Sequence, residues 1–451
     1  MTAAQIAVVV LTVLLNATDG FDVLSIAFAS PGIAKEWGIA QTGLGIVLSM
    51  ELIGMAVGSI LLGGVADKIG RRPALLTCLV VMGSGMLGTT TAGSPVQLSI
   101  WRIFTGIGIG GMLSGTNAVA AEFSSKRWRS FCISTMVIGY PLGGTFGGMF
   151  ASRLLATHNW RSVFFFGAAL AGVLLPLTYL VVPESVHWLT RKQPANALER
   201  VNAALRKLGH AVVAALPEVH ESDRKKSVAD IFSRGLIAIT LLVTAAYFLH
   251  IFTFYFIIKW TPKIVADMGF AASSAGQVLT WANVGGALGG AIFGLVAGRV
   301  GLRPLTIGIL ILASAAVAIF GRTPANLNDM AILAAIAGFF AFAGVSGLYS
   351  LAAHVFPTHV RATGTGFVIG VGRGGAVISP IVAGMLFDSG SVLRTVGAIM
   401  ASGSLLAAFV LLFLKLSTDT SVESIGRQHG IDASMAKGPD PRRAADALTG
   451  S

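Results

Sequence analysis

Long apolar runs recur along almost the whole chain and are separated by short polar connections. A membrane-spanning helix needs about 20 mostly apolar residues, and twelve stretches of the chain meet this requirement. They are residues 5–28, 43–65, 74–93, 97–121, 131–155, 161–182, 236–258, 271–296, 304–321, 329–353, 363–386 and 393–415. The pattern predicts an all-α, polytopic membrane protein with twelve spans.

A polar segment divides these spans into two sets of six. Residues 184–235 contain nine Lys and Arg side chains and are expected to form a central cytoplasmic loop. This loop separates an N-terminal half, residues 1–183, from a C-terminal half, residues 236–416. The tail, residues 417–451, is polar and is expected to be disordered.

Composition and charge agree with a membrane protein. Of the 451 residues, 54% are apolar and 12% are charged, whereas about a quarter of the residues of a soluble domain are charged. The net charge is +12, and 23 of the 32 Lys and Arg residues fall in segments that are cytoplasmic if both termini are inside. That bias is typical of topology, so no nucleic-acid partner is expected.

The chain offers no pattern for cofactor chemistry. Cys78 and Cys132 both lie inside apolar runs without Cys-x-x-Cys spacing, which argues against a disulfide framework or a cysteine metal site. No phosphate-binding loop, metal-ligand cluster or nucleophile triad stands out in the sequence. We therefore expect neither enzyme activity nor a cofactor.

The two halves repeat one another at a nearly constant offset. Four residues after the second span recur after the eighth at an offset of 231: Gly63, Asp67, Gly70 and Arg72 match Gly294, Gly298, Gly301 and Arg303. Two further residues recur at an offset of 232: Glu122 and Arg129 match His354 and Arg361. Six-helix repeats of this kind predict a substrate site between the halves, near the midplane of the membrane.

The segment 63–72, GGVADKIGRR, fits the pattern G-x-x-x-D-[RK]-x-G-R-[RK]. It resembles the signature loop of the major facilitator superfamily. Glycines allow helix ends to approach closely, and arginines can clamp facing carboxylates. The resemblance implies a gating role for five residues: Gly63, Asp67, Gly70, Arg71 and Arg72.

Three other segments point to a subfamily. The segments 19–22 (DGFD), 160–164 (WRSVF) and 183–185 (PES) resemble the aromatic acid:proton symporters. That resemblance implies uptake of a benzoate-like or hydroxybenzoate-like carboxylate with protons, by a monomer in a bacterial inner membrane. An importer of another organic anion or metabolite, such as muconate or a sugar, stays open, as does a drug efflux antiporter, although Tyr140 interrupts the Gly-Pro step typical of antiporters.

Three carboxylates fall well inside spans: Asp19, Asp22 and Glu51. Charged groups in the bilayer are costly and are functional candidates by default, so these three carboxylates are the candidates for proton coupling. Asp19 and Asp22 are spaced i, i+3 and share a helix face, so repulsion favours binding of a proton between them. His250 lies 231 residues after Asp19 and is expected to face it across the repeat axis, as a candidate to relay the proton or to hydrogen-bond the substrate. The alternative for Asp19 and Asp22 is a structural acid pair that is bonded to backbone, and the alternative for His250 is a core histidine.

Candidate substrate contacts come from both halves. Arg373 is expected to be the single basic residue deep in a span, since Arg102 and Lys259 fall at span borders, and a guanidinium can hold a carboxylate with two hydrogen bonds. Tyr140 and Trp281 are expected to stack on an aromatic ring. The expected hydrogen-bonding partners of the substrate are Asn117 and Asn283.

The remaining candidates concern gating. Arg102 opens a span with the pattern R-x-x-x-G-x-G-x-G and is expected either to couple to Asp19 or Asp22 or to pack at the interface. Glu122 and Arg129 are expected to form a cytoplasmic charge pair. Arg361, at the cytoplasmic edge of its span, is expected to act in gating.

Overall fold

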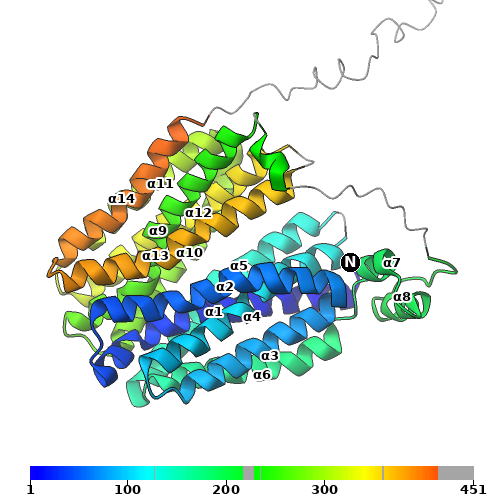
Figure 1. Cartoon of the computed structure of the whole chain (residues 1–451), viewed down its shortest axis with the longest axis horizontal. Helices are drawn as coiled ribbons and strands as arrows, with labels where there is room; N and C mark the ends of the chain where they lie inside the picture. Colours follow the sequence, from blue (N-terminus) through cyan, green and yellow to red (C-terminus); the bar gives the residue numbers. More distant parts are fainter. Residues whose placement is uncertain (126, 217–227, 234, 358–359, 415–451) are drawn as a thin grey trace, which may run out of the picture. The chain divides into compact units, whose positions relative to one another are not determined.

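The computed structural model describes residues 1–125, 127–216, 228–233, 235–357 and 360–414. Its long helices gather in two bundles (Figure 1). The first bundle contains α1 (Ala3–Trp37), α2 (Gln41–Ile69), α3 (Arg71–Thr90), α4 (Pro95–Phe123), α5 (Arg129–Thr157) and α6 (Arg161–Val181). The second contains α9 (Ile237–Asp267), α10 (Ala272–Val300), α11 (Leu302–Phe320), α12 (Leu327–Val355), α13 (Arg361–Asp388) and α14 (Leu393–Leu412).

These twelve helices coincide with the predicted spans, and eleven of them are long and apolar enough to cross a membrane. Helix α5, which has five glycines between Gly139 and Gly148, is not among the eleven. It packs against α1 and α10 through these glycines. The predicted all-α membrane fold is confirmed.

The segment predicted as a central loop is partly helical. Two short helices, α7 (Val186–Lys192) and α8 (Ala197–Lys207), follow α6, and the turn η1 (Val228–Phe232) precedes α9. Helices α7 and α8 share a small apolar core that includes Leu189 and Val201. The tail that is expected to be disordered lies outside the described residues.

Glycine pairs set the spacing of helices within each bundle. A Cβ built on Gly54 of α2 would lie 2.1 Å from the carbonyl oxygen of Ile103, and one on Gly106 of α4 would lie 2.1 Å from that of Glu51. The same contact recurs in the second bundle, where a Cβ on Gly338 would lie 2.0 Å from a carbonyl oxygen of α10. Small residues of this kind allow helix backbones to touch in membranes.

The bundles meet along two seams, α2 with α13 and α5 with α10. We call the end that holds the turn between α1 and α2 the α1–α2 end. From there, the α2–α13 seam runs past Ser49, whose hydroxyl donates to the carbonyl of Val377 (2.7 Å), and reaches Arg373. Farther along, a Cβ built on Gly64 or Gly370 has no neighbour within 4 Å.

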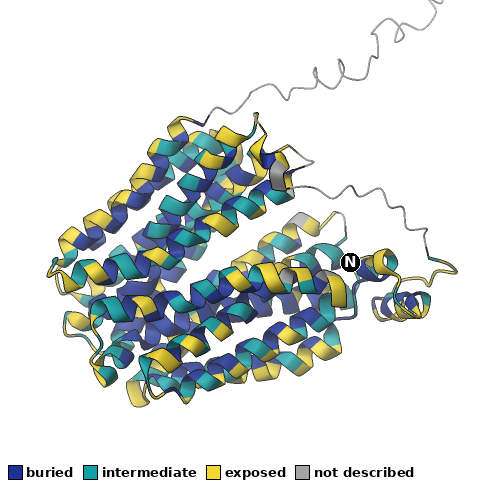
Figure 2. Ribbon diagram, in the orientation of Figure 1, coloured by how far each residue is buried: buried dark blue, intermediate teal, exposed yellow. Residues whose placement is uncertain are grey.

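The α5–α10 seam follows the same course. A Cβ on Gly276 would lie 2.6 Å from the Ser152 hydroxyl, and one on Gly148 would lie 2.5 Å from the Thr280 hydroxyl, whereas one on Gly294 meets nothing. Buried residues concentrate where helices face one another, and exposed residues lie on outward faces (Figure 2). Both seams are therefore closed at the α1–α2 end and do not continue to the opposite end at these positions.

One helix end is completed across the seam. The residue before α2, Ala40, provides no side-chain cap. Instead, the carboxylate of Asp388, at the end of α13, accepts hydrogen bonds from the backbone N–H groups of Gln41 (3.0 Å) and Thr42 (2.7 Å). Free N–H groups in the first turn need such acceptors, so α2 takes its cap from the other bundle.

Candidate transport site

Asp19 and Asp22 lie one turn apart on α1 and interact electrostatically. Asp19 is 1% exposed and Asp22 is fully buried. Within the described part of the chain, none of their four carboxylate oxygens accepts a hydrogen bond. An ionised carboxylate without donors is costly in such an interior, and a bound proton removes that cost.

Both acids have neighbours on other helices of the first bundle. A Cβ built on Gly167 of α6 would lie 3.1 Å from Oδ1 of Asp22. The thiol of Cys78 on α3 lies within electrostatic range of Asp19. The absence of a side chain at Gly167 thus leaves space beside the acid pair.

Glu51 has a different environment, because two cations hold it. Its Oε1 lies 2.5 Å from Nη2 of Arg102, and its Oε2 lies 3.3 Å from Nζ of Lys259. All three side chains are fully buried. Arg102 also donates to the backbone carbonyl of Asp22 (3.0 Å), and Lys259 donates to that of Val23. Three helices of the first bundle and one of the second therefore meet in one polar cluster.

Two sequence-based positions are wrong at this cluster. Lys259 does not end a span, because α9 continues through it to Asp267. Arg102 is buried inside α4, where its guanidinium also lies 5.2 Å from the ring centroid of Phe164. Arg373 is consequently not the single basic residue deep in a span.

The expectation that His250 faces Asp19 is also wrong. His250 is fully buried within the second bundle, where its Nδ1 lies 2.9 Å from the hydroxyl of Ser404 and its Nε2 lies 2.9 Å from the carbonyl oxygen of Ala341. Both ring nitrogens are occupied by α14 and α12. His250 thus points into the second bundle and not at Asp19.

Four of the five tyrosines gather around Arg373, at the seam between the bundles. The hydroxyls of Tyr247 and Tyr349 lie 3.2 Å apart, and Tyr140 interacts electrostatically with Tyr255. Three of these tyrosines interact electrostatically with Arg373: Tyr140, Tyr247 and Tyr255. A cation surrounded by aromatic rings and hydroxyls suits a carboxylate with an aromatic body.

A small cavity lies beside Arg373. Its volume is about 10 Å³, and its lining comprises Leu52, Met55, Tyr255, Arg373 and Ala376. This space holds about one water molecule. The guanidinium meanwhile donates to the Ser59 hydroxyl on α2 (3.3 Å). An aromatic ring can therefore enter only if these side chains, and with them the seam, move.

The other predicted substrate contacts lie elsewhere. Trp281 is 53% exposed and shares a stripe of α10 with the exposed Leu288 and Leu295, so its place in a central site is wrong. Asn283 is buried, and its amide donates to the carbonyl of Leu279 (2.9 Å). Asn117 is exposed on α4. Only Tyr140 of this group lies beside Arg373.

The signature loop forms a second cluster, at the end opposite the α1–α2 end. Nε of Arg71 lies 3.3 Å from Glu122, which also accepts from the hydroxyl of Ser185. Glu184 accepts from the backbone N–H groups of Arg71 (2.8 Å) and Arg72 (3.4 Å). The expected pairing of Glu122 with Arg129 is therefore wrong, because the carboxylate of Glu122 forms its ion pair with Arg71.

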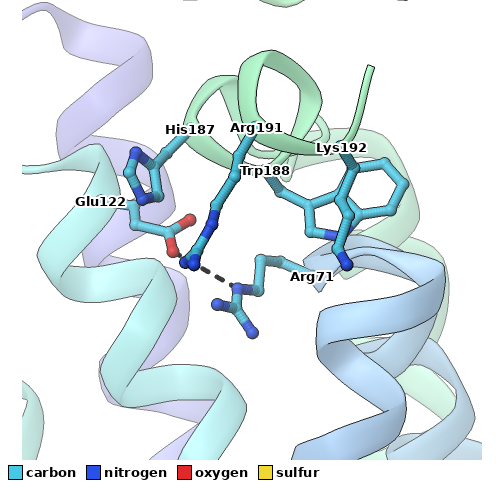
Figure 3. Close-up of a pocket in the computed structure, with 6 residues that line it drawn as sticks. All are labelled: Arg71, Glu122, His187, Trp188, Arg191 and Lys192. Carbon is cyan, nitrogen blue, oxygen red and sulfur yellow. Dashed lines mark hydrogen bonds and ion pairs between the residues drawn. The ribbon is translucent and has the colours of Figure 1, made fainter. Parts of the chain in front are cut away.

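A pocket of about 270 Å³ adjoins this loop (Figure 3). Its lining residues are Arg71, Glu122, His187, Trp188, Arg191 and Lys192. Gly70 turns the chain there with φ +107°, a conformation that glycine adopts without strain. Arg72 donates to the carbonyl of Tyr179 (2.6 Å), while the surroundings of Gly63 and Asp67 lie outside the described residues.

Helix α8 is attached beneath this loop. The Lys207 side chain donates to the carbonyl of Leu180 at the end of α6. Burial lowers the pKa of Lys207, and the nearby Arg72 lowers it further. Arg361, at the start of α13, is exposed and donates only to the carbonyl of Phe356 (3.3 Å) among the described residues.

Comparison with known families agrees with the fold and the loop. The model of the Major Facilitator Superfamily matches residues 11–320 and 243–443, which together span most of the chain. The chain belongs to the Major Facilitator Superfamily. It is an integral, multi-pass membrane protein of this transporter family.

Similar members of the superfamily carry names of aromatic acid transporters. The gallate transporter of Pseudomonas putida is 28% identical over 416 residues, covering 91% of this chain and 92% of that protein. The 3-(3-hydroxy-phenyl)propionate transporter of Escherichia coli is 29% identical, covering 90% and 92%. The inward-open xylose transporter XylE from E. coli has a TM-score of 0.72 at 18% identity, covering 94% and 99%, and supports the superfamily fold alone.

Lys259 is the functional candidate that sequence reasoning misses in this superfamily member. The available signal is the spacing of Lys259 and Lys263, one turn apart in a segment with few other polar residues. Lysines also occur at the ends of membrane helices, where their side chains reach the interface, so this signal is ambiguous without a structure.

Proposed function

We propose that the protein is a proton-coupled symporter that imports an aromatic carboxylate, such as benzoate or a hydroxybenzoate, by alternating access. It resides in a bacterial inner membrane with both termini cytoplasmic. The observation that carries the proposal is the position of two buried carboxylates that accept no hydrogen bond from the described residues, beside a buried cation cluster and a tyrosine-lined arginine at the seam. The printed names of the relatives support the substrate class.

The proton sites are Asp19 and Asp22. Among the described residues no group donates a hydrogen bond to their oxygens, whereas Glu51 forms ion pairs with Arg102 and Lys259. Glu51 is therefore already engaged by two cations, whereas the pair on α1 takes up and releases the proton. Since both acids are buried in the first bundle, the proton reaches them only through a rearrangement of the helices around them.

The substrate site is the tyrosine cluster around Arg373. The guanidinium binds the carboxylate, and the rings of Tyr140 and Tyr255 flank the aromatic body. Arg373 is bonded to Ser59 across the seam, so substrate binding replaces a contact between the bundles. This exchange links occupancy of the site to movement of one bundle against the other.

The access state follows from the seams. With both termini cytoplasmic, the closed α1–α2 end faces outward, and the end with the signature loop faces inward. Import requires the α2–α13 and α5–α10 seams to open at the α1–α2 end and to close near the signature loop. The Arg71–Glu122 contact lies within the first bundle and stiffens the loop that would meet the second bundle.

The test is uptake into proteoliposomes with a labelled substrate panel: benzoate, hydroxybenzoates, gentisate, muconate and a sugar, each with and without an imposed pH gradient. We expect accumulation of aromatic acids that depends on an acidic exterior. Asp19→Asn and Asp22→Asn should abolish accumulation while retaining exchange of labelled for unlabelled substrate. Arg373→Ala should abolish both, because it removes the carboxylate partner.

Trp281→Ala serves as the matched control, since it removes an aromatic side chain from the outward face of α10. Its uptake should equal that of the unmodified protein. Full accumulation by both aspartate variants would refute the proton sites. Unchanged substrate affinity in Arg373→Ala would refute the substrate site, and uptake of the sugar alone would refute the substrate class.

A further inference from the structure

We propose that Lys259 is a positioning residue for proton coupling: it ties the acidic cluster of the first bundle to the closed α1–α2 end. The inference rests on the proposed function for the meaning of the proton, but its geometry stands independently. Lys259 is fully buried, comes from the second bundle and binds two groups of the first, the Glu51 carboxylate (3.3 Å) and the carbonyl of Val23.

Glu51 is shared between the bundles. One oxygen faces Arg102 of its own bundle (2.5 Å), and the other faces Lys259 (3.3 Å). Arg102 already touches the carbonyl of Asp22 and interacts electrostatically with its carboxylate. When Asp22 loses its proton, its carboxylate competes with Glu51 for Arg102. Protonation of Asp22 therefore sets how Glu51 divides its charge between Arg102 and Lys259.

Other titratable groups face the same cluster. They comprise Asp19 on α1, Cys78 on α3, Tyr140 on α5, Tyr255 on α9 and Arg373 on α13. Asp22 differs from these groups because Arg102 contacts its residue directly. A change of charge at Asp22 thus reaches Lys259 through two short contacts, Arg102 to Glu51 and Glu51 to Lys259.

The turn of α9 that carries Lys259 also builds the closure. The indole N–H of Trp260 donates to the carbonyl of Pro380 on α13 (3.2 Å). One turn farther on, Lys263 pairs with Asp267, which accepts from the side chain of Gln41 (3.3 Å). Movement of Lys259 therefore shifts the segment of α9 that contacts α13 and α2 at the closed end.

The experiment measures the width of the α1–α2 end by double electron–electron resonance, without substrate. Spin labels replace His158, at the end of α5, and Ala271, before α10; both residues are exposed. Cys78 and Cys132 are replaced by alanine. Distances are recorded in acidic and alkaline buffer for the unmodified residue, for Lys259→Met and for Lys263→Met. Lys263→Met is the matched control for the pH response, since it removes a buried lysine one turn away and leaves the Glu51–Lys259 contact in place; its absolute distance is not compared, because Asp267 also binds Gln41.

We expect the distance distribution of the unmodified protein and of Lys263→Met to change with pH. Lys259→Met should shift the distribution toward longer distances and lose the pH response. Lys259→Arg should keep the pH response, and Glu51→Gln should lose the pH response. Glu51→Gln combined with Lys259→Met, which leaves no unpaired charge between them, keeps the test valid if a single variant folds poorly; it should also lack the pH response.

A pH response in Lys259→Met equal to that of the unmodified protein would overturn the inference. Spin-label distances that do not change with pH in the unmodified protein would also overturn it. Because the labels report closure without substrate, failure here is distinguishable from failure of the proposed function. A protein that imports no aromatic acid can still show the Lys259-dependent response. A protein that imports one can also lack it.

Discussion

Gly106→Ala tests whether backbone contact between α2 and α4 positions the buried cluster. The Cβ that this substitution adds would lie 2.1 Å from the carbonyl oxygen of Glu51 and 3.0 Å from Cα of Gly54. Both atoms belong to backbone, so no side chain can turn aside. An ordinary carbon–oxygen contact is about 3.3 Å, so the helices must separate by about 1 Å at this point.

The magnitude follows from overpacking in a close-packed interior. Insertion of a methyl group against fixed neighbours costs about 1–3 kcal/mol. Replacing glycine with alanine in an unobstructed helix instead stabilises by about 0.5–1 kcal/mol. The separation also pulls Glu51 from Arg102, whose ion pair spans 2.5 Å, so we expect proton-driven uptake to fall together with stability.

The assay compares Gly106→Ala with Gly172→Ala, a substitution on α6 where an added Cβ has no neighbour within 4 Å. The apparent melting temperature in detergent is measured as the temperature at which the monodisperse chromatographic peak is lost. Gradient-driven uptake is measured in proteoliposomes. Gly172→Ala should melt at or above the temperature of the unmodified protein, and Gly106→Ala several degrees below it. Equal melting temperatures for the two variants would refute the reasoning.

Three further predictions follow from single contacts. Asp388→Ala should destabilise the closed α1–α2 end by about 1 kcal/mol, because it removes the cap of α2; a longer His158–Ala271 spin-label distance would report this, and an unchanged distance would contradict it. His250→Ala should lower the melting temperature, since it leaves the hydroxyl of Ser404 unpaired, yet the pH profile of uptake should keep its shape; a shifted profile would restore His250 to the proton path. Glu184→Ala should free the backbone N–H of Arg71 and reduce uptake without changing substrate affinity in a binding measurement, whereas a loss of affinity would tie the signature loop to the substrate site.

Much of the fold could be predicted from the sequence, because length and hydropathy are local properties. The twelve apolar runs correspond to the twelve long helices. Even α5, with its many glycines, can be predicted from the length of its apolar run. The ends were harder. Lys259 makes the predicted end of α9 too early, because the cost of burying a lysine can be read from the sequence, whereas its partner Glu51, 208 residues away, cannot.

The candidate site was predictable in its acids and less so in its contacts. Asp19, Asp22 and Glu51 are buried, as their place in spans requires. The pairing of Glu122 with Arg71 and the burial of His250 within the second bundle, away from Asp19, depend on how each helix is rotated about its axis. A single sequence does not determine that rotation, because a helix in lipid is apolar on nearly all sides. For the same reason Trp281, on a lipid-facing stripe, resembled a binding-site aromatic.

The cap that Asp388 places on α2 makes one piece of secondary structure depend on the access state. When the bundles separate at the α1–α2 end, the N–H groups of Gln41 and Thr42 lose their acceptor and face water. Amide hydrogen exchange at these two positions then follows the fraction of molecules that are open there, because exchange requires a broken hydrogen bond. Deuterium uptake in the first turn of α2, measured by mass spectrometry, therefore reports the open fraction on protein that carries no spin label and no substitution.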